Sequence, residues 1–242
     1  MPSVKKIAHR GASGKYPENT RLAFVKAIEM GVDMIELDCQ LTEDGHVVVF
    51  HDERLRRTAG ARGTVRSKTL AQLKALDIGQ WKKKSYRGER ILTLEEALEI
   101  LAGDVDLCLE IKSYPESPPG IEIKILFILS HYDYLHRSIL SSFDYRSLGR
   151  VRELAPEAAL GVICGSRIQE DALAAAKQLE AKSVHLQKTL ASRDFLNLAW
   201  EEGLDVYVWT VNEAREMQAL IALGVQGIIS DFPEKFRKLQ QR

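Results

Sequence analysis

The chain has 242 residues with 34 basic and 34 acidic side chains, so its formal net charge is 0, and it is 45% hydrophobic and 28% charged. These values are typical of a globular protein and exclude a disordered or collagen-like chain. The strongest apolar run, at residues 125–129, ends at Ser130 and His131, so we expect no transmembrane helix of about 20 apolar residues.

The N-terminal residues predict a strand followed by a helix. Val4–Ala8 is a short apolar strand that ends at His9. Asn19 or Thr20 can cap the helix, and Gly31 can end it. The expected apolar face of this helix consists of Leu22, Val25 and Ile28.

The next segment predicts a hairpin followed by a basic insertion. Met34–Leu41 and Val47–Phe50 have strand-like composition and are separated by the turn sequence TEDGH at residues 42–46. The segment 53–92 has weak periodicity, and its 12 basic and 3 acidic residues give it a charge of +9. The segment is either an ordinary solvated surface or a charged surface that attracts an anionic substrate.

After residue 92, strand and helix patterns alternate regularly. Thr93 and Glu96 form a capping box for a helix that ends at Gly103. The later helices are expected to begin at Ser192, at Asn212 and near Pro233, the first two ending at Gly203 and Gly224. Further strands are expected to begin near Val105, Arg137, Ala158, Ser183, Asp205 and Val225.

This order predicts a TIM (β/α)8 barrel. Eight strands that alternate with helices favour parallel pairing, and a chain of this length accommodates eight such units. An open doubly wound sheet is the main competitor, but the sequence has no glycine-rich nucleotide-binding motif that would favour it. We therefore expect one domain, residues 1–242, with 53–92 as a small insertion after the second strand. Three widely spaced cysteines, which form no zinc-type motif, predict reduced thiols in a cytoplasmic protein.

Acidic side chains gather at the predicted strand ends. Glu36 and Asp38 are two residues apart and share one face of their strand, as do Glu110 and Lys112. If both faces line the barrel, three carboxylates converge, and one hard divalent cation, Mg²⁺ or Ca²⁺, would neutralise them. In the alternative interpretation Glu36 and Asp38 point outward, pair with helix lysines and leave the core to their apolar neighbours.

Two histidines also follow apolar strands, and each precedes a charged residue. His9 is followed by Arg10, and His51 by Asp52. A single histidine at a strand end is usually structural, but a pair beside a carboxylate cluster favours an acid and a base. Arg10 and Lys112 beside a cation would suit a phosphate group, whereas Arg10 could instead simply pair with an acidic neighbour.

These motifs resemble the glycerophosphodiester phosphodiesterase family. The resemblance rests on HRGASGKYPENT at residues 9–20, IELD at 35–38, DG at 44–45, VFHD at 49–52, LEIK at 109–112, SSFD at 141–144, WTVN at 209–212 and SD at 230–231. The matches follow the family order over nearly the whole chain, which makes the set specific although each string alone is weak.

The resemblance implies a TIM barrel that hydrolyses glycerophosphodiesters, such as glycerophosphocholine, to glycerol 3-phosphate and an alcohol. It assigns Glu36, Asp38 and Glu110 as metal ligands and His9 and His51 as the acid–base pair. By the same resemblance, Arg10 and Lys112 contact the phosphate, and Trp209 packs against the glycerol. The resemblance also implies that Glu18 stabilises the first loop and that His185 contacts the substrate.

The mechanism expected from these residues starts with a glycerol 2-hydroxyl that attacks its own phosphate, with His9 as base and His51 as acid, and ends with water opening the cyclic phosphate. Three alternatives are a phospholipase D-like lyase that stops at the cyclic phosphate, a barrel phosphosugar isomerase or aldolase, and a non-catalytic barrel that binds anions. We expect no nucleic-acid partner, because only Trp81 and Tyr86 interleave with the basic residues and no recognition motif is present.

Overall fold

The computed structural model describes residues 4–114, 120–165 and 169–239, and eight parallel strands close into a barrel within these ranges. The strands in order around the barrel are β1 (Lys5–His9), β2 (Met34–Leu41), β5 (Asp106–Ile111), β6 (Ser138–Ser142), β7 (Ala159–Cys164), β8 (Ser183–Gln187), β9 (Asp205–Trp209) and β10 (Gly227–Ser230). Closure follows because β1 pairs with both β2 and β10. The predicted TIM barrel is confirmed.

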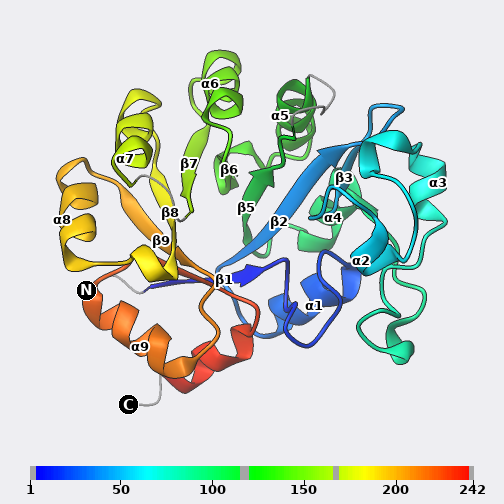
Figure 1. Ribbon diagram of the computed structural model, residues 1–242, viewed down its shortest axis with the longest axis horizontal. Helices are drawn as coiled ribbons and strands as arrows, with labels where there is room; N and C mark the ends of the chain where they lie inside the picture. Colours follow the sequence, from blue (N-terminus) through cyan, green and yellow to red (C-terminus); the bar gives the residue numbers. More distant parts are fainter. Residues whose placement is uncertain (1–3, 115–119, 166–168, 240–242) are drawn as a thin grey trace.

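Helices surround these strands, as Figure 1 shows. They are α1 (Arg21–Glu29), α4 (Leu94–Leu101), α5 (Ile121–His131), α6 (Tyr145–Leu154), α7 (Gln169–Gln178), α8 (Arg193–Glu201) and α9 (Ala214–Leu223), with short 3-10 helices η3 (Leu135–Arg137), η4 (Lys188–Leu190) and η5 (Pro233–Leu239). The predicted caps of α1, α4 and α8 are confirmed, because Thr20, Thr93 and Ser192 each accept a backbone hydrogen bond from the first turn.

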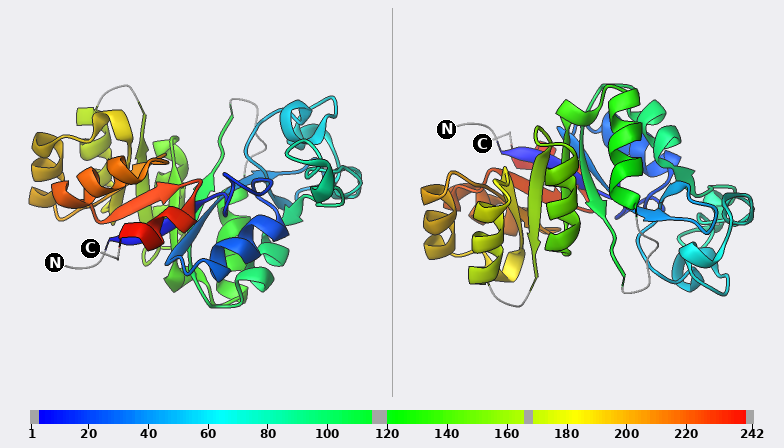
Figure 2. Two further views of the ribbon diagram at one scale, coloured as in Figure 1. Left: turned by 90° about the horizontal axis from the view of Figure 1, so that it is seen from below. Right: turned by 90° about the horizontal axis from the view of Figure 1, so that it is seen from above.

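Two local predictions were wrong. The buried face of α1 consists of Ala23, Phe24 and Ala27 rather than the face predicted from Leu22. Asn212 caps no helix, because its side chain is hydrogen-bonded to Asp231 and α9 begins after Glu213. The final helix, predicted to begin near Pro233, is confirmed as η5, a 3-10 helix that begins at Pro233 and lies beside β1 (Figure 2).

The basic insertion forms its own small core at one side of the barrel (Figures 1 and 2). It lies between β3 (Val47–Val49), antiparallel to β2, and β4 (Leu92–Thr93), an unpredicted strand antiparallel to β3. Its elements are α2 (Arg56–Ala59), η1 (Val65–Ser67), α3 (Leu70–Lys74) and η2 (Lys84–Tyr86), too short for a clear hydrophobic period. The core of this side unit consists of Val48, Phe50, Leu55, Val65, Leu73, Ile78 and Ile91.

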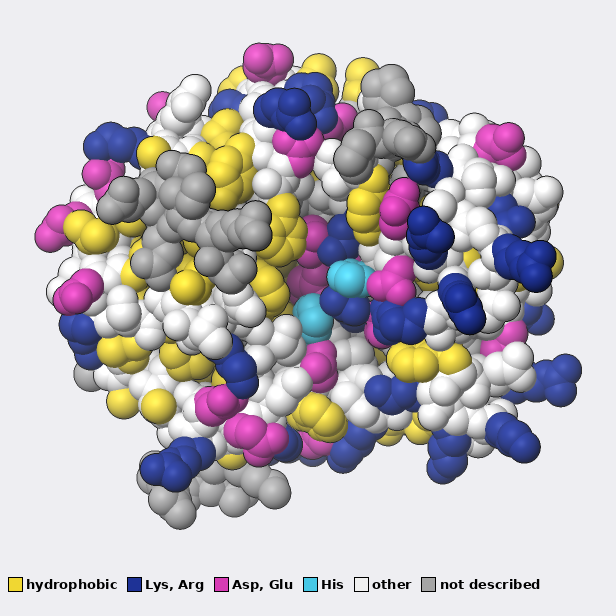
Figure 3. All heavy atoms as spheres, in the orientation of Figure 1, with side chains coloured by type: hydrophobic (Ala, Val, Ile, Leu, Met, Phe, Trp, Pro, Cys, Tyr) yellow, Lys and Arg dark blue, Asp and Glu magenta, His cyan; other side chains and the backbone are white. Residues whose placement is uncertain are grey.

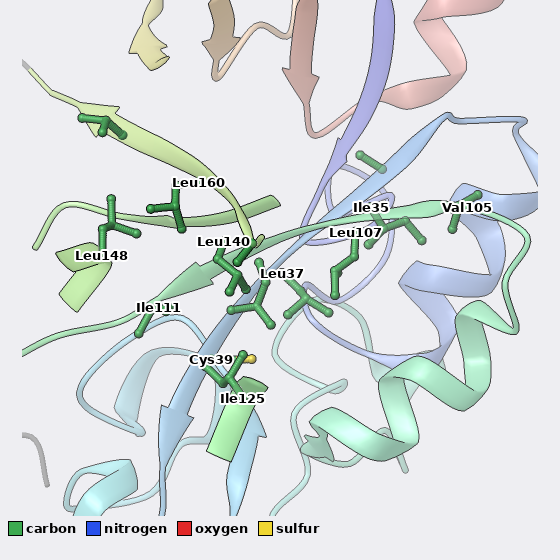
Figure 4. Close-up of a cluster of buried hydrophobic side chains, with 14 of the residues drawn as sticks. Ile35, Leu37, Cys39, Val105, Leu107, Ile111, Ile125, Leu140, Leu148 and Leu160 are labelled. Carbon is green, nitrogen blue, oxygen red and sulfur yellow. The ribbon is translucent and has the colours of Figure 1, made fainter. Parts of the chain in front are cut away.

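The main core lies between the strands and the outer helices, as Figure 4 shows for one part of it. Ile35, Leu37 and Cys39 of β2 pack there together with Ile125 of α5. Because neighbouring strand residues point to opposite faces, the intervening Glu36 and Asp38 face the barrel interior. The alternative in which these two carboxylates point outward is therefore wrong. Among the described residues, no helix combines the length and apolar character that a membrane span requires.

Candidate active site

Three carboxylates meet inside the barrel near the C-terminal ends of its strands. Asp38 of β2 lies next to Glu110 of β5 in the strand register. Glu36, Asp38 and Glu110 each offer an oxygen, and these oxygens all lie within 4.8 Å of one another. The Lys112 Nζ atom lies 2.9 Å from Asp38 Oδ1 and donates a 2.5 Å hydrogen bond to Glu110 Oε1. The structure thus brings together the three predicted metal ligands and one predicted phosphate contact.

The electrostatics of this cluster fit a divalent cation. Burial raises the pKa of Glu36 well above its ordinary value, and the charges of Asp38 and Glu110 raise it further. Burial also raises the pKa of Glu110, in spite of the nearby Lys112. Asp38 differs, since Lys112 and Arg10 outweigh burial and hold the pKa of its carboxyl well below the usual range. An all-oxygen set with uncompensated negative charge is the donor set that Mg²⁺ and Ca²⁺ prefer.

His9, at the end of β1, is held by a carboxylate from the other end of the chain. Its Nδ1 atom lies 2.6 Å from Asp231 Oδ1, which also accepts a hydrogen bond from Ser13 Oγ at 3.0 Å, while Asp231 Oδ2 accepts one from Asn212 Nδ2 at 2.7 Å. Burial raises the pKa of Asp231, but the hydrogen bond from His9 outweighs it and the pKa is about 2. Because Asp231 is ionised and accepts only, we assign the proton to Nδ1, which leaves Nε2 free, 4.0 Å from Glu36 Oε2.

His51, which follows β3, forms a second histidine–carboxylate pair. Its Nδ1 atom lies 2.7 Å from Asp52 Oδ1, and its carbonyl accepts hydrogen bonds from Tyr114 Oη at 2.8 Å and Gln40 Nε2 at 3.2 Å. Both the ring and the backbone of His51 are therefore held in place. Burial lowers the pKa of His51 below its ordinary value, and the positive charge of Lys112 lowers it further.

Arg10 connects the first loop to the carboxylate cluster. Its backbone N–H donates to Glu36 Oε2 at 2.9 Å, its Nη1 donates to Glu18 Oε1 at 2.9 Å, and its Nε lies 3.3 Å from Asp38 Oδ2. Arg10 and Asn19 have φ values of 54° and 56°, in the left-handed region that non-glycine residues rarely adopt. Asn19 Nδ2 donates to Asp38 Oδ2 at 2.8 Å, so contacts with the cluster stabilise both strained residues.

These groups border a cavity of ≈ 180 Å³ with one charged and one apolar side. The apolar side includes Phe143, Ile163, Trp209 and Ile229. The Trp209 ring lies edge-on to Phe143, with centroids 5.8 Å apart, and its Nε1 donates to the His185 carbonyl. Figure 3 shows the hollow with histidine and acidic side chains inside it and hydrophobic side chains along one edge. Such a cavity suits a small molecule with an anionic group and a carbon-rich part.

Comparison with known proteins identifies the family. The model of the glycerophosphoryl diester phosphodiesterase family matches residues 9–235. The chain belongs to this family. A glycerophosphodiester phosphodiesterase of Caldanaerobacter subterraneus is 40% identical over 238 residues, which cover 98% of this chain and 97% of that protein. A glycerophosphodiester phosphodiesterase of Bacillus subtilis is 33% identical over 253 residues, which cover 97% of this chain and 86% of that protein.

The barrel is also similar to solved structures of glycerophosphodiester phosphodiesterases and related phosphodiesterases. A phosphodiesterase of Oleispira antarctica, solved in complex with the product sn-glycerol 3-phosphate, superimposes with a TM-score of 0.86 at 31% identity, covering 97% of this chain and 95% of that one. A structure from Silicibacter pomeroyi superimposes with a TM-score of 0.90 at 27% identity, covering 99% of this chain and 94% of that one. The resemblance to this family that the sequence motifs indicate is confirmed.

Within this phosphodiesterase fold, most of the ten residues singled out from sequence border the cavity. Eight of them line it, namely His9, Arg10, Glu36, His51, Glu110, Lys112, His185 and Trp209. Asp38 and Glu18 do not line the cavity. Asp38 contacts the lining residues Lys112 and Arg10, and Glu18 contacts Arg10. Their catalytic and binding roles stay predictions.

His185 has surroundings unlike those of His9 and His51. Its side chain is buried, stacks on Tyr207 with ring centroids 5.2 Å apart, and places Nε2 2.9 Å from Ser183 Oγ. Burial lowers the pKa of His185 to about 3. The ring is therefore neutral at physiological pH, and its Nδ1 atom lies 3.9 Å from Cys108 Sγ.

Sequence reasoning missed the carboxylates that hold the two histidines. The pair His9 and Asp231 is separated by 222 residues, and no local spacing reveals it. Their positions at the ends of the first and last strands were a usable signal, because these strands are neighbours in a closed barrel. Asp52 adjoins His51, but adjacency in sequence does not show that the two side chains turn toward each other.

Proposed function

We propose that the chain is a metal-dependent enzyme that hydrolyses small glycerophosphodiesters, such as glycerophosphocholine and glycerophosphoethanolamine, to glycerol 3-phosphate and the free alcohol. One observation carries the proposal. His9 held by Asp231 and His51 held by Asp52 border the same small cavity as the carboxylate cluster. Two oriented imidazoles supply the proton transfers that breaking a phosphodiester requires.

Glu36, Asp38 and Glu110 are proposed to hold one divalent cation, Mg²⁺ or Ca²⁺. When bound, such a cation would polarise the phosphoryl group and offset the charge of the carboxylates. The geometric support is the convergence of three oxygens within 4.8 Å, and the electrostatic support is the raised pKa of Glu36, which burial and its two carboxylate neighbours cause.

In the proposed first step, the glycerol 2-hydroxyl attacks phosphorus and its proton passes to His9 Nε2. The new oxygen–phosphorus bond forms as the bond from phosphorus to the alcohol oxygen breaks, and His51 donates a proton to that leaving oxygen. In the second step water opens the cyclic phosphate with the two histidines in exchanged roles. A neighbouring hydroxyl has a high effective concentration, which favours this internal attack.

The partners of the two carboxylates support this division of roles. Besides His9, Asp231 accepts hydrogen bonds from the neutral Ser13 and Asn212 side chains, so its negative charge can stabilise the imidazolium formed when His9 accepts a proton. His51 has a lowered pKa because burial, reinforced by Lys112, disfavours its charged form. An anionic phosphodiester bound beside it adds negative charge and favours the protonated form that an acid needs.

The cavity walls support the proposed substrate. Arg10 and Lys112 border the charged side and can contact two phosphate oxygens, while Trp209 can pack on the glycerol carbons. His185 is proposed to contact the substrate as a neutral group. The product-bound Oleispira antarctica phosphodiesterase gives independent support for glycerol 3-phosphate as the product.

The proposed setting is the reducing cytoplasm, where the enzyme would recover glycerol 3-phosphate from the breakdown of phospholipids. Cys39, Cys108 and Cys164 support this setting, because all three are buried free thiols.

The decisive experiment is an enzyme-coupled assay for glycerol 3-phosphate release from a panel of glycerophosphodiesters, with EDTA and metal add-back as separate arms. Phosphorus NMR of the same reactions distinguishes hydrolysis from a lyase reaction, which would accumulate the cyclic phosphate. No release from any diester in the presence of Mg²⁺ or Ca²⁺ would refute the proposal. His51→Ala should retain less than about a tenth of wild-type activity, because general acid–base catalysis contributes about 10²–10⁴-fold.

A further inference from the structure

One arginine of the basic side unit binds two carboxylates that each contact a residue of the candidate active site. We call the pair Asp52 and His51 the Asp52 arm, and the pair Glu18 and Arg10 the Glu18 arm. Arg57 lies on α2, outside the residues that line the cavity. Its Nε and Nη2 donate to the two oxygens of Asp52 at 2.6 and 2.9 Å, and its Nη1 and Nη2 donate to the two oxygens of Glu18 at 2.7 and 2.7 Å. One planar guanidinium thus binds two carboxylates in bidentate fashion, a geometry that lysine cannot reproduce.

Each of these carboxylates contacts a residue of the proposed reaction. Asp52 Oδ1 lies 2.7 Å from His51 Nδ1, and Glu18 Oε1 accepts from Arg10 Nη1 at 2.9 Å. In the part of the chain that the structure describes, Asp52 receives side-chain hydrogen bonds only from His51 and Arg57. Without Arg57, the Asp52 carboxylate would be free to rotate away from the imidazole, and Glu18 would be paired with Arg10 alone.

The charges of Glu18, Arg10 and Arg57 also indicate that Arg57 affects the active site. Burial raises the pKa of Glu18, but hydrogen bonds from Arg57 and the charge of Arg10 outweigh it, and the net effect lowers that pKa. Glu18 is thus ionised and shared by two arginines. Since Arg57 takes up part of the charge of Glu18, the positive charge of Arg10 remains more available to a phosphate.

The side unit itself holds Arg57 in place. The guanidinium carbon lies 5.7 Å from the centre of the Trp81 ring, and Lys82 Nζ lies 5.6 Å from the same ring and donates to the Ser13 carbonyl at 2.7 Å. Leu55, just before α2, is fully buried in the core of the side unit. Several basic residues of the insertion thus bind groups of the protein itself: Arg57, Arg66, Lys74, Lys82 and Arg90.

We infer that Arg57 is a positioning residue that holds His51 through Asp52 and Arg10 through Glu18, and so couples the basic side unit to the active site. The inference rests on the proposed function, because it assigns Arg57 a task in that reaction. It also assigns the side unit a role other than general attraction of anions.

The Asp52 arm is tested by a double-variant cycle in kcat. On glycerophosphoethanolamine, Arg57→Gln should lower kcat about 10- to 30-fold, a part of the general acid–base contribution. Asp52→Asn should lower kcat similarly, and the double variant should be within about threefold of the worse single variant, since both changes disrupt one contact. Arg57→Lys should retain intermediate activity. Arg56→Gln, an exposed neighbour on the same helix, is the matched control and should stay within about twofold of wild type.

The Glu18 arm is tested by binding, which needs no turnover. Arg57→Gln should weaken the binding of inorganic phosphate, measured by calorimetry, about 3- to 10-fold, and in a Glu18→Gln background it should have little further effect. Circular dichroism and Tm establish that each variant is folded. If Arg57→Gln does not fold, kcat and phosphate affinity are measured on Arg57→Lys instead.

Three outcomes would overturn the inference. The losses of kcat in Arg57→Gln and Asp52→Asn could multiply in the double variant, Arg57→Gln could lower Tm alone with kcat and phosphate affinity unchanged, or Arg56→Gln could match Arg57→Gln. A wild-type protein that releases no glycerol 3-phosphate would instead refute the proposed function, and phosphate binding would then decide the role of Arg57.

Discussion

Replacing Asp231 by asparagine tests whether the contact between the first and last strands serves catalysis. The 2.6 Å contact between His9 Nδ1 and Asp231 Oδ1 becomes an ion pair whenever His9 takes up a proton. A hydrogen bond to a charged group contributes about 1.5–3 kcal/mol, which corresponds to about 10- to 150-fold in rate. The asparagine amide also brings two N–H donors into a site where Ser13 and Asn212 already donate. In one of the two orientations of this amide, its N–H group faces His9 Nδ1 and favours the tautomer in which the proton lies on Nε2. We expect kcat to fall about 10²-fold.

The assay is release of glycerol 3-phosphate at saturating substrate between pH 5 and 9. Burial raises the pKa of Asp231, but the hydrogen bond from His9 outweighs burial and the pKa is about 2. The carboxylate is therefore ionised throughout this range, and kcat should be lowered at every pH. Asp205→Asn, at the start of β9 and thus at the opposite end of the barrel, is the control and should leave kcat unchanged. A kcat of Asp231→Asn within about threefold of wild type would refute the reasoning.

Three further predictions concern the metal site and the buried centre of the barrel. Dialysis against EDTA should abolish glycerol 3-phosphate release. Glu110→Gln should raise the Mg²⁺ or Ca²⁺ concentration that restores half of the activity at least about tenfold, equivalent to about 1.4 kcal/mol. If the variant and wild type need the same metal concentration, Glu110 is not a ligand. Burial lowers the pKa of His185 to about 3, so the unfolded chain binds one more proton between about pH 3 and 6.5, and the free energy of unfolding falls as the pH drops. The stability that wild type gains over His185→Gln should therefore shrink by about 2 kcal/mol from pH 7 to 5 in urea unfolding, and a constant difference would contradict the assigned pKa. Gly161→Ala would place its Cβ 2.5 Å from His185 Nε2, so it should destabilise the fold by about 1–3 kcal/mol, and an unchanged urea midpoint would show that the ring can move.

Much of the fold was predictable because its signals are local. The caps Thr20, Thr93 and Ser192 act within one helical turn, so their residue types and spacing suffice to place the helix starts. The start of β8 was predicted at the residue where the structure has it, and that of β9 as well. The short elements of the basic side unit were not predictable, because segments of three to five residues carry no clear hydrophobic period.

The candidate site divides in the same way. Glu36 with Asp38 and Glu110 with Lys112 were visible as strand residues two apart, but strand periodicity shows only that they share a face and not which face. Packing of Ile35 and Leu37 against the helices decided that question, since the carboxylates must then point inward.

The sequence alone determined the order of elements, the barrel class and the residue types that gather at the strand ends, because propensities, caps and alternation act over a few residues. Only the tertiary structure decided which side chains meet: His9 with Asp231 through closure of β1 on β10, and Arg57 with both Asp52 and Glu18 through the fold of the side unit. These contacts join segments 5 to 222 residues apart, and their formation depends on how the whole chain packs. The zero net charge of the sequence likewise concealed a basic unit and an acidic cluster, whose relation became visible only in the folded chain.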